Sequence, residues 1–99
     1  MPSQAFAKSV AREFGAELRR VRARANMTQQ ALAERAEIDP VFVSYLENGH
    51  RQPSLAVVIA IERALGLAPG VLARRVALQL TSSHKDKRSK IKASKTTPP

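Results

Sequence analysis

The chain has 99 residues, enough for one domain with a modest core and too few for two. It holds no Cys, which excludes disulfides, thiolate metal sites and a cysteine nucleophile, and its few aromatic residues predict an aliphatic core. Seventeen basic residues against eight acidic ones give a formal net charge of +9, which favours a polyanionic partner. Because no signal-peptide pattern and no long apolar run is present, a cytoplasmic protein without a membrane segment is expected.

The basic residues are concentrated at the C-terminal end. Residues 81–99 contain six basic residues and one acidic residue, which leaves a net charge of +4 on residues 1–80. Because Ile91 is the only large apolar side chain in this tail, burial cannot offset the entropy of ordering it. We therefore predict a folded domain over residues 1–80 and a disordered basic tail over residues 81–99. The tail is either a flexible arm that contacts phosphates or a solubilising segment, and the sequence favours neither.

The first predicted element is a long amphipathic helix that ends near Ala25. Its apolar residues recur at steps of three or four: Phe6, Val10, Phe14, Leu18 and Val21. Five arginines occupy its other sides. Most of them are expected to form an ordinary solvated face, with Arg19 or Arg20 within reach of a phosphate.

Two short helices follow a break at Asn26-Met27. Thr28 can cap the first of them, predicted over residues 29–36, through its side-chain oxygen. Asp39 is a strong N-cap for the second, and Pro40 fits a first helical turn, where no backbone N–H is needed. This helix is predicted to end near residue 48, with Gly49 in the left-handed position that follows. Two short helices joined in this way are typical of a helix-turn-helix.

Two further helices complete the predicted fold, which is an all-α, compact five-helix domain. Pro53-Ser54 opens the fourth helix and Gly66 ends it, and its inward residues are Leu55, Val58, Ile61 and Leu65. Pro69 opens the fifth, whose apolar residues are Val71, Leu72, Val76 and Leu80. These four residues exceed what so small a core needs, so they are the expected dimer interface.

The third helix can serve two purposes at once. Val43 and Leu46 can face the core together with Ile38. The residues left pointing outward are Pro40, Val41, Ser44 and Tyr45, with Phe42 at the margin. A recognition helix buries one face and presents its N-terminal turn to the major groove, where apolar side chains can contact thymine methyl groups. For Val41 and Phe42, simple core packing is the alternative.

The segment TQQALAERAEIDPVFVSYLENGHRQPSL, residues 28–55, resembles the Cro/repressor-type (XRE family) helix-turn-helix domains. The resemblance covers about residues 13–72. Within it, IDPVFVSYLENG is most similar to small standalone regulators such as the controller proteins of restriction–modification systems. The resemblance implies a lambda-repressor-like fold and sequence-specific binding to double-stranded DNA.

The resemblance also implies roles for individual residues. Gln29 falls where the family has a Gln that holds a phosphate, and Asn48 and Arg51 match phosphate-contacting positions in the loop after the recognition helix. Glu47 matches an acidic residue that forms a structural pair with a first-helix arginine, here Arg22. The full set of residues expected at the DNA is Thr28, Gln29, Pro40, Val41, Phe42, Ser44, Tyr45, Asn48 and Arg51.

Two departures from the family pattern stand out. Glu37 replaces the Gly that is usual in the turn, and a left-handed backbone there would be strained by roughly 1 kcal/mol. The recognition face also lacks the Gln, Asn or Arg that forms bidentate bonds to purines, so only Ser44 and Tyr45 can hydrogen-bond. Specificity is therefore expected to come largely from thymine methyl groups, DNA shape and flanking arginines.

The expected function is that of a transcription regulator acting as a homodimer on a (pseudo)palindromic operator. An antitoxin or antiactivator whose main task is to bind a protein partner is the alternative. An enzyme is not expected, because the sequence holds no Cys, no paired His, no metal cluster and no glycine-rich phosphate loop. No cofactor or metal is expected, and the protein is expected in the cytoplasm, at the bacterial nucleoid through its DNA.

Overall fold

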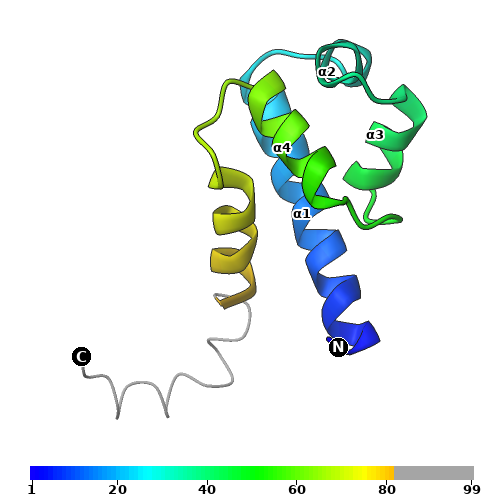
Figure 1. Ribbon diagram of the computed structural model, residues 1–99, viewed down its shortest axis with the longest axis vertical. Coiled ribbons are helices and arrows are strands. Elements are labelled where there is room, and N and C mark those ends of the chain that lie inside the picture. Colours follow the sequence, from blue (N-terminus) through cyan, green and yellow to red (C-terminus); the bar gives the residue numbers. More distant parts are fainter. Residues whose placement is uncertain (82–99) are drawn as a thin grey trace, which may run out of the picture.

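The computed structural model describes residues 1–81. Its helices are α1 (Gln4–Arg24), α2 (Gln29–Ala36), α3 (Pro40–Glu47) and α4 (Leu55–Ala64), followed by a fifth helical segment over residues 71–81 (Figure 1). No strand occurs in this part of the chain, so the prediction of an all-α, five-helix fold is confirmed. The predicted basic tail lies outside the described residues except for Thr81, which is helical.

Side-chain caps define where the first four helices begin. Ser3, Thr28, Asp39 and Ser54 each precede a helix with extended backbone, and each accepts a hydrogen bond from a backbone N–H of the first turn. The predicted caps of α2 and α3 are therefore confirmed, and Pro40 is the first residue of α3. Each cap stabilises its helix by about 1 kcal/mol and involves only residues of the same turn, so the starts of these helices are determined locally.

The core is built on one face of α1. Phe14, Leu18 and Val21 are buried there and belong to a single cluster that includes side chains from every other helix. In Figure 1, α3 and the fifth helix lie on opposite sides of α1. The prediction of an inward Leu55 is wrong, because this side chain lies in the first turn of α4, outside the core cluster, and is 74% exposed.

The fifth helix belongs to the core of the single chain. Leu72 is fully buried and Val76 is 5% exposed. These two residues, expected at a dimer interface, instead pack inside the protomer, because the fifth helix covers the side of the core away from α3 (Figure 1). Val71 and Leu80 of the expected set remain half-buried.

A carboxylate from α4 caps the fifth helix. Glu62 is 4% exposed, and its two oxygens accept hydrogen bonds from the N–H groups of Gly70 at 3.0 Å and Leu72 at 2.9 Å. Gly70 is left-handed with φ +85°, so the helix begins at residue 71 and not at Pro69 as predicted. A buried anion from another helix thus satisfies N–H groups that the helix itself leaves unpaired.

Replacing Glu62 with Ala is expected to lower the free energy of unfolding by about 1–2 kcal/mol, because two backbone N–H groups lose their acceptor. Glu62→Gln keeps one acceptor oxygen and should lose less. Urea denaturation followed by circular dichroism measures both variants, with the exposed Glu34→Ala as the control. An unchanged midpoint for Glu62→Ala would contradict the capping role.

A close backbone approach joins α1 to α3. Gly15 is buried on α1, and a Cβ at this position would lie 2.4 Å from the carbonyl oxygen of Leu46 and 2.7 Å from that of Glu47. Real Cβ atoms essentially never come this close to a neighbour, so only Gly fits here. The end of α3 is therefore seated directly on the α1 backbone, which fixes the direction of its outer face.

Candidate nucleic-acid interface

The turn between α2 and α3 sets the angle between the two helices. Glu37 has a left-handed backbone with φ +59° and ψ +46°, and the N–H of Ile38 donates to the Ala33 carbonyl at 2.9 Å. A non-Gly residue thus occupies the strained position that the sequence predicts, at a cost of roughly 1 kcal/mol. Oδ1 of Asp39 then accepts a hydrogen bond from the N–H of Val41 at 2.8 Å, which starts α3.

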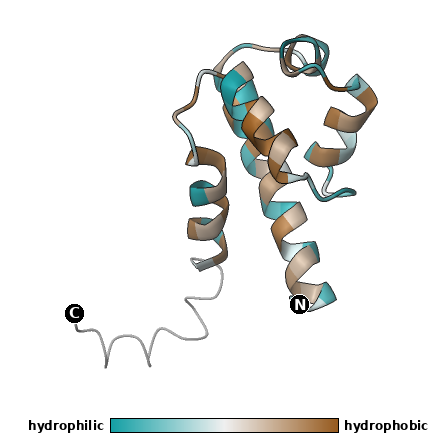
Figure 2. Ribbon diagram, in the orientation of Figure 1, coloured by the Kyte–Doolittle hydropathy of each residue, from teal (hydrophilic) through white to brown (hydrophobic). Residues whose placement is uncertain are grey.

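Helix α3 presents two distinct faces. Val43 and Leu46 are fully buried, whereas Val41 is 56% exposed and Tyr45 is 40% exposed. Pro40 is exposed and Ser44 is half-buried, whereas Phe42 is half-buried and packs against the core cluster. Hydrophobic residues recur along α3 (Figure 2), and among them Val41 is exposed. The predicted division of this helix into a buried and an exposed face is confirmed, and core packing is excluded as the role of Val41.

A buried carboxylate at the end of α3 joins it to the two preceding helices. Glu47 accepts two hydrogen bonds from Arg22, from Nε to Oε2 at 2.5 Å and from Nη2 to Oε1 at 3.0 Å. Its Oε1 also accepts a hydrogen bond from Nε2 of Gln29 at 2.9 Å, and Nη1 of Arg22 donates to the Met27 carbonyl at 2.7 Å. The predicted structural pair of Arg22 and Glu47 is confirmed.

The surroundings of this pair keep both groups ionised. Burial raises the pKa of Glu47, but hydrogen bonds from Arg22 and Gln29, together with the charges of Arg22 and Arg19, outweigh burial and hold the pKa below its ordinary value. The hydrogen bond to Glu47 raises the pKa of Arg22, although burial opposes it. The pair is therefore a fixed structural element.

Polar side chains from α1 and from the loop after α3 lie next to the end of α3. Nη2 of Arg19 donates to Oδ1 of Asn48 at 3.1 Å, and Nδ2 of Asn48 donates to the Ser44 carbonyl at 3.0 Å. The guanidinium of Arg51 lies over the Tyr45 ring, 5.5 Å from its centroid. The sequence predicts a role for each of these residues but not the hydrogen bonds between them. The bond between Arg19 and Asn48, for example, forms only because α3 packs on α1.

At the start of α2, Thr28 and Gln29, which are both expected at the DNA, each take part in a hydrogen bond within the protein. Thr28 is exposed, and its Oγ1 accepts a hydrogen bond from the N–H of Ala31 at 2.9 Å. Gln29 is half-buried, and its amide donates to Glu47. Because the N–H of Ala31 is already paired with Thr28, the N–H groups of Gln29 and Gln30 are the first-turn donors that this end of α2 can offer to an anion.

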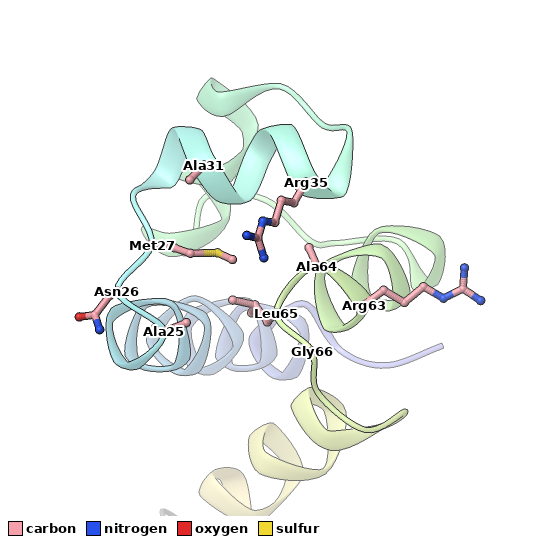
Figure 3. Close-up of a pocket in the computed structure, with 9 residues that line it drawn as sticks. All are labelled: Ala25, Asn26, Met27, Ala31, Arg35, Arg63, Ala64, Leu65 and Gly66. Atoms are coloured by element: carbon pink, nitrogen blue, oxygen red, sulfur yellow. The ribbon is translucent and has the colours of Figure 1, made fainter.

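A separate open hollow of about 490 Å³ lies between the end of α1, α2 and the end of α4 (Figure 3). Arg35 points into it, toward Met27 and Leu65, whereas Arg63 points away from it. None of its lining residues belongs to α3. This hollow is therefore distinct from the exposed face of the third helix.

Two other features are absent from residues 1–81. No group of His, Asp and Glu side chains there is arranged to hold a metal ion. In the same range, no helix combines the length and the apolar character needed to cross a membrane.

Sequence comparison identifies a family. The sequence model of a family described as "Helix-turn-helix domain" matches residues 13–76, well over half of the chain. The matched region contains α2, α3 and α4 complete, most of α1 and the first part of the fifth helix. A search of the curated proteins gives no match.

Several solved structures share the fold. The clp gene regulator ClgR from C. glutamicum has a TM-score of 0.64 and 29% identity, covering 69% of this chain and 87% of that chain. The restriction-modification controller protein C.AhdI from Aeromonas hydrophila has a TM-score of 0.60 and 29% identity, covering 67% and 94%. The wild-type restriction-modification controller protein C.Esp1396I, at 18% identity, has a TM-score of 0.65 with 72% and 93% covered, and this likeness concerns the fold alone.

Proposed function

The chain belongs to the helix-turn-helix family, and on that premise we propose that it is a sequence-specific DNA-binding transcription regulator that acts as a homodimer on a (pseudo)palindromic operator. The observation that carries the proposal is the exposed apolar face of α3, held by a back that is completely buried. Two of the similar structures are a gene regulator and a restriction-modification controller protein, and they support the same class of function.

The inner side of α3 is anchored in the folded protein. Val43 and Leu46 anchor α3 in the core, and the ion pair of Arg22 with Glu47 holds its end to α1. Binding therefore requires little ordering of the backbone, which favours affinity. A helix anchored in this way can place Val41 and Tyr45 against base edges in the major groove.

The chemistry of this surface favours a particular mode of readout. Val41 offers apolar contact to a thymine methyl group, and the Tyr45 hydroxyl can donate or accept one hydrogen bond. The Arg51 guanidinium lies over the Tyr45 ring, which brings a positive charge to the edge of the face. Pairs of bidentate bonds to purines are not available here, so DNA shape is proposed to supply much of the specificity.

Replacing Tyr45 with Ala is expected to weaken binding to the cognate site by about 1–3 kcal/mol and to relax sequence preference. Gln29→Ala is expected to weaken binding to all sequences alike, because it disturbs the phosphate-facing end of α2 and its bond to Glu47. Gel-shift titrations with DNA from upstream of the coding sequence and with random duplex measure both effects, after circular dichroism has shown that the variants are folded. Equal losses of Tyr45→Ala on cognate and random DNA would contradict the base-facing role.

The homodimer is proposed to form through the outer side of the fifth helix. Leu78 is 57% exposed, and Val71, seven residues earlier, shares its face of the helix. In Figure 1 this helix lies on the other side of α1 from α3, so pairing there would leave both recognition helices free. Such dimers contact half-sites roughly 34 Å apart on one face of the DNA.

Leu78→Asp is expected to shift the protein to monomer and to weaken operator binding, because it places a charge in the proposed interface. Sedimentation velocity over a range of protein concentrations measures the shift, with Gln79→Asp as a control on the same exposed turn. The core variant Leu72→Asp is unsuitable, because Leu72 is fully buried and the domain would unfold. A wild type that stays monomeric at high concentration would contradict the proposed dimer.

A further inference from the structure

The first turns of α1 lie outside the family match and carry two cations. The match begins at residue 13, whereas Lys8 and Arg12 precede it. A helix turns about 100° per residue, so Lys8, Arg12 and Arg19 lie within about 40° of one another on the same side of α1. Gly15, which contacts the end of α3, lies on this side too. The three cations therefore flank the place where the recognition helix meets α1.

The loop after α3 is held against this extension of α1. The side-chain amide of Gln52 donates a hydrogen bond to the Ala7 carbonyl, 45 residues earlier in the chain. Gly49 approaches so closely that a Cβ on it would lie 3.2 Å from the Cα of Arg12, and its backbone is left-handed with φ +73°. These contacts within the chain fix the position of the loop relative to Lys8 and Arg12.

Between the loop and the extension lies an open hollow of about 420 Å³, which we call the basic hollow. Its lining comprises Gln4, Ala7, Lys8, Ala11, Arg12, Asn48, Gly49, His50, Arg51 and Gln52. Three of these residues are cations, and none is acidic. Within residues 1–81, no carboxylate forms an ion pair with Lys8, Arg12 or Arg51. All three are exposed, so their charges are available to an anion.

The basic hollow is continuous with the recognition surface. Arg51 lines the hollow and also lies over the ring of Tyr45, on the exposed face of α3. Asn48 lines it as well and is bonded to Arg19. An anion in the hollow would therefore lie next to any duplex that α3 contacts.

We propose that the basic hollow, with Lys8 and Arg12 of the α1 extension, binds the phosphodiester backbone of DNA that flanks the bases contacted by α3. This inference rests on the proposed DNA-binding function and deepens it, since it lengthens the contacted segment beyond the matched helix-turn-helix. The group that would bind is a phosphate. Because the hollow is open to solvent, it favours the phosphates of a continuous strand over a small free anion. Contacts to phosphates carry no sequence preference, so they add affinity to specific and random DNA equally.

The salt dependence of binding tests this inference. Each phosphate contact contributes about −0.9 to the slope of log K against log salt, so the double variant Lys8→Ala/Arg12→Ala should reduce the slope by about 1.8. The matched control is Arg24→Ala/Arg63→Ala, which removes the same charge from exposed positions that do not line the hollow. The control should change the slope much less. Fluorescence anisotropy on cognate and random duplexes, with hydroxyl-radical footprinting on the cognate duplex, gives the readouts.

The outcomes separate this inference from the proposed function. The inference gains support if the Lys8/Arg12 variant loses slope on both duplexes and loses footprint protection only at the outer edge of the half-site. If the salt slope of the Lys8/Arg12 variant equals that of the wild type or of the control variant, the inference is overturned. This holds even when Tyr45→Ala still abolishes sequence preference. Binding of inorganic pyrophosphate that the double variant loses, with an unchanged DNA slope, also overturns it, because the hollow would then serve a free anion. A wild type without competitor-resistant DNA binding contradicts the proposed function itself.

Discussion

Replacing Glu47 with Ala is expected to lower the free energy of unfolding by about 3 kcal/mol. The carboxylate side chain is fully buried and accepts hydrogen bonds from Arg22 and Gln29. Its removal leaves the guanidinium of Arg22, whose side chain is only 17% exposed, without a counter-charge. Removing one partner of such a pair leaves the other charge desolvated and unpaired.

Urea denaturation at neutral pH measures this loss. Glu34→Ala removes an exposed carboxylate from α2 and is the matched control, with an expected change of less than about 0.5 kcal/mol. DNA binding should also fall for Glu47→Ala under conditions where the variant is folded, because α3 loses its tie to α1 and α2. If Glu47→Ala and Glu34→Ala had equal effects on stability, the pair would not have the structural role assigned to it.

The same pair predicts how stability depends on pH. The pKa of Glu47 is lower in the folded protein than its ordinary value of 4.5, although burial works in the opposite direction. A group whose pKa falls on folding stabilises the protein above its unfolded pKa, and this contribution is lost as the pH falls through the folded pKa. The stability difference between wild type and Glu47→Ala should therefore be largest near neutral pH and should shrink below about pH 4. A constant difference down to about pH 2 would contradict the assigned shift.

Replacing Gly15 with Ala is expected to destabilise the domain by about 3 kcal/mol, although the sequence alone predicts the opposite sign. Ala is favoured over Gly inside a helix by about 1 kcal/mol. The structure reverses this preference, because the new Cβ would lie 2.4 Å from the carbonyl oxygen of Leu46. That oxygen belongs to the backbone of α3, so relief of the overlap requires movement of the whole of α3.

Two measurements distinguish the packing effect from helix propensity. Ala16→Gly, at the exposed neighbouring position, should cost about 1 kcal/mol from propensity alone. Gly15→Ala should lose more than this in urea denaturation. Gly15→Ala should also bind DNA more weakly than the wild type under conditions where both are fully folded, because the substitution displaces α3. A gain in stability for Gly15→Ala would show that α1 and α3 are not in close contact.

Local signals were sufficient for most of the secondary structure and for the two-faced third helix. Thr28 and Asp39 are caps whose effect depends only on the next few residues, and the period of the apolar residues identified the buried Val43 and Leu46. The ion pair of Arg22 with Glu47 followed from the family resemblance and is present in the structure. The DNA contacts themselves stay predictions, because they require a partner.

Other structural features depend on contacts between helices and could not be predicted from local sequence. Leu72 and Val76 have the same apolar character as an interface residue, and only the docking of the fifth helix places them in the core. The Glu62 cap joins residues eight and ten positions apart in sequence, and the Gly15 contact joins α1 to the end of α3, with the whole of α2 between them in the chain.

The sequence by itself determined the presence of the helices, the caps of α2 and α3 and the division of α3 into two faces, because these depend on neighbours within one or two turns. Tertiary structure alone decided the start and the burial of the fifth helix, the requirement for Gly at residue 15 and the basic hollow between α1 and the loop after α3. Each of these depends on the distance between backbones that are far apart in the chain, and no local pattern encodes that distance.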